Sequence, residues 1–314
     1  MPRHRSLTLK SFVDSVDFNL MKRYIEQKVP AKFLPKTIIH DGDYVDRVLD
    51  DLKKQGQDKI VIEVLDDFTR INDLGQKTMN VLIQATDLYD IRRSGRETKS
   101  GLALHLFLDH PEAFQYAYDR YCFLTSSSTV REYIVDSGKV RLSKSKLADF
   151  KKIASSFYGQ QEKGYDVVLR HYEDSPEIII VVDRGSYFQT KPVWEDGKIS
   201  TITYRPANED ILIFNKDSSI LSIKAPYDKD RINYRAAFYK TILGSTEPEP
   251  EPDALYNLKP IQDGSFDYGE NEDIRQVKLL SVNLQFPDKA SVVLTSKDLL
   301  KSLGNEFSGY SLKT

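Results

Sequence analysis

Apolar residues recur every three or four positions through the first 125 residues, which is the spacing of one face of an amphipathic helix. Gly75 separates two of these helical segments, and Pro111 opens the last one. The predicted helices span 11–27, 43–54, 59–72, 76–89, an apolar run that ends at Leu108, and a segment that begins at Pro111. We therefore predict a helical N-terminal domain over 1–125, packed as a bundle.

The apolar period changes from about 3.6 to 2 near residue 165, which favours strands. Five predicted strands span 166–171, 177–183, 199–204, 210–214 and 220–224, and a helix follows over 231–243. Short turns between the strands favour an antiparallel meander with a helix on one face. Residues 126–164 form a basic connector with a short helix over 145–157, ended by Gly159. The predicted fold class is therefore α+β: a helical N-terminal domain followed by an antiparallel sheet domain, 165–244, with a flanking helix.

Alternating proline and glutamate over 245–253 predict a stiff, solvated linker, because this composition supports neither helix nor sheet. The remaining residues, 254–314, predict a small strand-strand-helix module. Its strands fall over 273–286 and 290–294, and its helix is capped by Ser296. A module of this size is marginal by itself, so we expect it to dock on the sheet or on a partner.

Composition places the chain among ordinary globular proteins. Of its 314 residues, 40% are hydrophobic and 29% are charged, and no apolar run is long enough to span a membrane. No signal peptide is recognisable, and the one cysteine, Cys122, excludes an internal disulfide, so we expect a cytoplasmic protein. The net charge of −2 gives no reason by itself to expect nucleic acid or membrane as a partner.

Motifs for the common enzyme classes are missing from the sequence: there is no Walker A loop, no G-x-G-x-x-G and no G-x-S-x-G. The histidines show no metal-binding spacing, so we expect neither a metal nor a cofactor. Lys224, with Asp210 and Asp217 before it, suggests a metal-dependent nuclease or hydrolase, but Ser222 stands where such a site needs a carboxylate. Cys122 lies among apolar residues and is expected to be buried rather than nucleophilic.

Two groups of basic residues are candidates for phosphate binding. They consist of Lys139, Arg141, Lys144, Lys146, Lys151 and Lys152 in one group, and Arg92, Arg93, Arg96 and Lys99 in the other. A basic sequence of this kind is also expected on an ordinary solvent-exposed surface that binds no ligand. The aromatic residues Tyr187, Phe188 and Trp194 suit a protein interface, although they would equally suit a core beneath the sheet.

The stretch 167–244 carries Tyr187-Phe, Trp194-Glu-Asp-Gly, Tyr204-Arg-Pro-Ala, Ile211-Leu-Ile-Phe and Leu221-Ser-Ile. In these segments it resembles a family of bacterial proteins with no assigned activity. Such proteins often belong to multi-gene systems such as phage defence. The absence of a catalytic set, together with the marginal C-terminal module, favours an adaptor or interaction subunit that binds another protein in such a system. The alternatives are a sequence-independent nucleic-acid-binding accessory protein and the metal-dependent nuclease or hydrolase. The chain is thus more in keeping with a non-enzymatic protein than with an enzyme.

Overall fold

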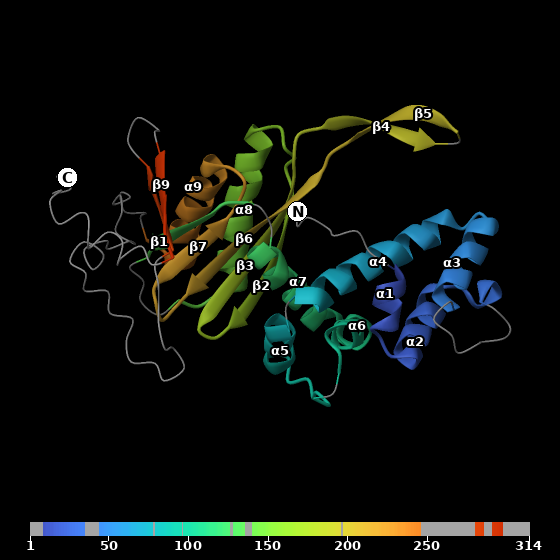
Figure 1. The fold of residues 1–314 in the computed structure, drawn as a ribbon. Coiled ribbons are helices and arrows are strands. Elements are labelled where there is room, and N and C mark those ends of the chain that lie inside the picture. The colour runs from blue at the N-terminus through green and yellow to red at the C-terminus, as the bar shows by residue number, and fades with distance from the viewer. Residues whose placement is uncertain are drawn as a thin grey trace. The chain divides into compact units, whose positions relative to one another are not determined.

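The computed structural model describes nine stretches of the chain. They are 9–34, 44–77, 79–95, 97–125, 128–135, 140–195, 197–245, 280–285 and 291–297. The chain divides into two compact units, Met1–Pro248 and Glu249–Thr314. The first unit is α+β, with N-terminal helices followed by an antiparallel sheet and further helices (Figure 1), as predicted.

The N-terminal helices pack around one apolar core that includes Phe12, Tyr24 and Phe68. Their bounds are α1 Leu9–Asp14, α2 Phe18–Lys28, the 3-10 helix η1 Ala31–Phe33, α3 Tyr44–Lys54, α4 Asp58–Lys77, α5 Met79–Leu88, α6 Lys99–Asp109 and α7 Pro111–Thr125. The single helix predicted over 11–27 is wrong. It is split because the Asp17 carboxylate accepts the backbone N–H groups of Asn19 and Leu20, and so caps α2.

Two glycines expected to end helices lie inside them instead. Gly75 is within α4, where a Cβ would lie 2.9 Å from the Cα of Ser100, so glycine lets α4 and α6 approach closely. Gly159 is within α8 (Lys144–Gln160), where a Cβ would lie 2.5 Å from the Tyr165 ring. Both glycines serve packing rather than helix termination.

The sheet has five antiparallel strands in the order β1-β7-β6-β3-β2. Their bounds are β1 Val130–Ile134, β2 Val167–Asp174, β3 Glu177–Gly185, β6 Ala207–Asn215 and β7 Ile220–Lys224. The strand β1 lies in the segment predicted as a connector, which is a correction: it is an exposed edge strand whose residues lack a clear apolar alternation. The segment predicted over 199–204 is a strand, but it does not pair with this sheet.

The sheet is the middle layer of the first unit, because the two sides of its central strands bury different cores. Ile179 and Ile211 belong to the core of the N-terminal helices. Ile180 and Leu212 belong to the second core, which α8, α9 (Asp228–Ala237) and the π-helix η2 (Phe238–Leu243) complete. This alternation explains why β3 and β6 read as continuous apolar runs.

In the second unit the described residues contain one antiparallel pair, β8 Ser281–Gln285 and β9 Ser291–Thr295. The rest of the predicted first strand and the helix expected after Ser296 lie outside the described residues. Among the residues described, no helix has both the length and the apolar character that a membrane span requires.

A candidate protein-binding arm

A two-stranded ribbon, here called the arm, is inserted between the central strands β3 and β6. It consists of β4 Gln189–Glu195 and β5 Lys198–Tyr204. Among the described strands these two pair only with each other, and Figure 1 shows the ribbon leading out from the ends of β3 and β6. No strand was predicted over 187–194, and most of these residues form β4. Pro192 in the middle of β4 hides this strand from pattern reading.

The outer end of the arm carries two large apolar side chains that bury little of their surface. Trp194 and Ile199 are cross-strand partners, and they are 74% and 72% exposed. Opposite residues of an antiparallel pair point to the same side, so these two side chains form one patch. Tryptophan next to an aliphatic residue is the composition of a protein-binding anchor. The alternative that these aromatics form a core beneath the sheet is therefore wrong for Trp194.

The inner end of the arm, here called the root, is fastened by Arg205. Its Nη1 donates to the carbonyl oxygens of Glu162, at 2.7 Å, and Ser186, at 3.1 Å. The same guanidinium lies 4.2 Å from the centre of the Phe188 ring, a cation–π contact. Phe188 thus belongs to the root, and because it is 65% exposed its role as an interface residue stays a prediction.

Lys163 connects the root to the interior of the protein. Its side chain is 1% exposed, and its Nζ lies 5.4, 5.3 and 5.3 Å from the ring centres of Tyr158, Tyr187 and Tyr227. The nearest carboxylate is Asp230, whose Oδ1 is 3.7 Å from Nζ. Burial lowers the pKa of Lys163, and the charge of Asp230 acts against that shift. The buried ammonium group of Lys163 thus restrains the Tyr187 ring through a cation–π contact.

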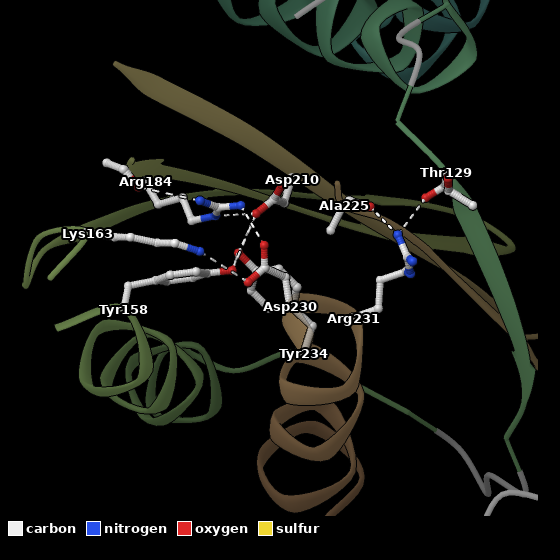
Figure 2. A network of polar contacts seen from close by, with 10 residues as sticks. Thr129, Tyr158, Lys163, Arg184, Asp210, Ala225, Asp230, Arg231 and Tyr234 are labelled. Carbon is white, nitrogen blue, oxygen red and sulfur yellow. Dashed lines mark hydrogen bonds and ion pairs between the residues drawn. The ribbon is translucent and has the colours of Figure 1, made fainter. Parts of the chain in front are cut away.

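A buried polar network lies next to Lys163 and includes Arg184, the residue before Gly185 at the end of β3 (Figure 2). Arg184, near the end of β3, donates to the carboxylates of Asp210, at 2.5 Å, and Asp230, at 2.9 Å. The hydroxyl of Tyr234 donates to Asp210 at 2.9 Å and accepts a hydrogen bond from Tyr158 at 2.9 Å. Burial raises the pKa of Asp210, and the charge of Arg184 opposes that shift.

This network explains why the root holds its place. Arg184 comes from β3, Asp210 from β6, and Asp230 and Tyr234 from α9, so the contacts join the two strands that carry the arm to the helix layer. At the arm side, a Cβ on Gly185 would collide with the carbonyl oxygen of Lys163, so this position requires glycine. The residues involved lie far apart in sequence and match no motif, which is why sequence reasoning missed them.

A second charged cluster lies on the opposite face of the sheet, centred on Arg170. Its guanidinium contacts Asp119 at 2.9 and 3.0 Å and Glu209 at 2.9 Å, and it also donates to Asp183. Three carboxylates share one cation here. Burial, together with the charge of Asp119, raises the pKa of Glu209 to about 7.

The residues considered for nuclease chemistry are used differently. The ammonium of Lys224 donates to the backbone carbonyls of Cys122 and Phe123, whereas the carboxylate of Asp210 pairs with Arg184. Ser222 donates to Glu132 at 3.3 Å. Cys122 is buried, as expected, and burial raises the pKa of its thiol. Within the described residues, no three histidine, cysteine or acidic side chains are grouped in a way that would hold a metal ion.

The structure separates the predicted basic residues. Arg141, Lys144, Lys151 and Lys152 are exposed on or before α8, whereas Lys146 donates to the Ile242 carbonyl at 2.5 Å. On the face covered by the N-terminal helices, Arg92 and Lys99 are exposed and Arg93 pairs with Asp87 at 3.3 Å. Lys139 and Arg96 lie outside the described residues. The two groups therefore flank opposite sides of the sheet and do not form one surface.

Comparisons with known proteins add no relative: no protein-family model matches the chain, and a search of the curated proteins found no significant match.

Proposed function

We propose that this chain is a protein-interaction subunit that binds another protein through the outer end of its arm, as an adaptor within a bacterial multi-component system. The observation that carries the proposal is the exposed pair of Trp194 and Ile199 on a ribbon that pairs with no other described strand. A two-stranded ribbon is marginal by itself, and apolar surface on it is costly unless it is used.

The root supports the same proposal. Flexible binding elements lose conformational entropy on binding, whereas an element already held in place loses little. Arg205, which follows β5, and the buried Lys163 hold Phe188 and Tyr187 at the base of β4, so the arm is already ordered before a partner binds. A groove on the partner that accepts one indole ring and one branched aliphatic side chain would fit the exposed pair.

The test is quantitative affinity capture from the natural host, comparing the wild type with the double variant Trp194→Ser, Ile199→Ser. The expected result is one or more proteins retained by the wild type and lost by the variant. Ile62→Ser is the matched control, because Ile62 is also strongly exposed but lies on α4. The captured protein is then purified, and its affinity for the double variant is expected to fall at least about 30-fold, corresponding to about 2 kcal/mol for one interface anchor. Equal retention by wild type and double variant would contradict the proposal.

A second candidate function is sequence-independent nucleic-acid binding by α8. Lys144 and Lys151 are exposed and seven residues apart, which places them on one helix face, and Lys152 is exposed beside them. The triple variant that replaces these three lysines by glutamine is expected to abolish any duplex binding seen at low salt, and wild-type binding is expected to weaken steeply as salt rises. Absence of wild-type binding at low salt would exclude this function.

A further inference from the structure

The two edges of the arm differ in their capacity to pair with a further strand. An edge strand presents unpaired N–H and C=O groups, and proline removes one of the N–H groups. Pro192 lies in the middle of β4, whereas β5, with the sequence Lys-Ile-Ser-Thr-Ile-Thr-Tyr, contains no proline and no acidic residue. Five of its seven residues are β-branched or aromatic. The β4 edge is therefore blocked and the β5 edge is open.

The ladder of the arm identifies which residues of β5 direct their backbone groups outward. Pro192 is opposite Thr201 and has no N–H to exchange, so this is a pair without mutual hydrogen bonds. Such pairs alternate with bonded ones along an antiparallel ladder, so the pairs of Ile199 and Thr203 are of the same kind. The N–H and C=O groups of Ile199, Thr201 and Thr203 consequently point away from β4. Among the described strands none pairs with this edge.

We propose that the β5 edge pairs antiparallel with the β5 edge of a second copy of this chain, giving a four-stranded sheet β4-β5-β5-β4 across a twofold axis at Thr201. In this register Ile199 of each copy lies opposite Thr203 of the other, and the two Thr201 residues face each other. It is the register that engages all three outward residues of both copies. Shifting it by two residues leaves outward groups of each copy unpaired.

The side chains agree with this register. Lys198 lies opposite Tyr204 of the other copy rather than opposite a second lysine, and the Tyr204 ring already accepts a cation, since Lys191 Nζ lies 5.6 Å from its centre. The Ile202 side chains, each 44% exposed, become diagonal neighbours across the axis. A surface that contacts itself must be self-complementary in this way.

The decisive variant is Thr201→Pro, which removes the outward N–H at the twofold axis. It leaves β5 without an edge donor there, as Pro192 leaves β4 without one. Sedimentation equilibrium from micromolar to near-millimolar concentration is expected to show a dimer for the wild type and for the control Thr201→Val. It is expected to show at least about tenfold weaker dimerisation for Thr201→Pro. A wild type that stays monomeric over this range, or a dimer that Thr201→Pro leaves unchanged, would overturn the proposal.

Cross-linking decides the matter even if Thr201→Pro disturbs the arm. Cys122 is buried, so Thr201→Cys introduces one accessible thiol into the chain. Mild oxidation is expected to link two Thr201→Cys chains much faster than two Thr190→Cys chains. The reason is that residues 190 of the two copies lie on the outer strands, about 14 Å apart across three strand spacings and about 13 Å apart along the strands, which is about 20 Å in all. Equal rates would refute the register. Because Trp194 is not altered, these results are independent of the adaptor proposal.

Discussion

Replacing Arg184 by methionine tests whether the buried polar network holds the first unit together. The guanidinium is the shared partner of two carboxylates, Asp210 at 2.5 Å and Asp230 at 2.9 Å, and none of the three side chains is exposed. Methionine keeps much of the apolar volume but removes the charge. Asp210 would retain the hydroxyl of Tyr234, and Asp230 would retain Lys163 at 3.7 Å.

The expected cost follows from this geometry. Removing one partner of a buried ion pair costs about 3–5 kcal/mol, because a carboxylate is left in a medium that solvates it poorly. Arg231→Met is the matched control: this arginine is also buried against α9, but it donates to the carbonyls of Ala225 and Thr129 and to the exposed carboxylate of Asp228. Losing those contacts is expected to cost about 1–2 kcal/mol.

Urea unfolding followed by far-UV circular dichroism measures both free energies of unfolding, and equal m-values show that the two variants unfold the same surface. Adding Asp210→Asn to Arg184→Met is expected to restore part of the loss, so the double variant is less destabilised than the sum of the single ones. A cost for Arg184→Met no greater than that for Arg231→Met would refute the role given to the network.

Three further predictions concern other parts of the molecule. Because the pKa of Glu209 is raised from 4.5 to about 7, the folded state keeps a proton that the unfolded chain loses, and stability falls by up to about 3 kcal/mol as pH rises through that window. Glu209→Gln should therefore gain stability relative to the wild type between about pH 5 and pH 8 in urea unfolding, and a constant difference would contradict this. Gly75→Ala should destabilise by about 1–3 kcal/mol, because the new methyl group meets the backbone of Ser100; a thermal midpoint equal to that of the wild type would refute the close contact. Arg205→Met should increase amide hydrogen exchange in β4 and β5 while leaving exchange in β3 unchanged, and unaltered exchange in the arm would show that the root does not restrain it.

Periodicity predicted the parts of the fold that depend on burial alone. The helices of the N-terminal region and the strands β3 and β6 were found because each buries a regular face or both faces. The errors lie where a single contact overrides the pattern. The Asp17 carboxylate begins a new helix, and Gly75 is required by a neighbouring helix rather than by a helix end. The Asp17 cap is local, but the apolar spacing continues across it and conceals the break, whereas the contact of Gly75 with Ser100 joins residues far apart in sequence.

The candidate site was predicted only in part. Trp194 was named because aromatic residues in a polar segment suggest an interface, but its partner Ile199 was assigned to the sheet. The arm escaped notice because a ribbon exposed on both sides has no apolar alternation, and Pro192 argues against a strand. The root depends on Lys163 and Arg184, ordinary charged residues whose partners are brought near only by the fold.

Trp194 can serve as an intrinsic fluorescence reporter of binding at the outer end of the arm. It is the only tryptophan of the chain and stands 74% exposed at the outer end of the arm. Its fluorescence should therefore be red-shifted and readily quenched by acrylamide in the free protein. A blue shift with protection from quenching would show that a partner covers Trp194. A fluorescence titration can therefore measure partner binding to the arm without an added label.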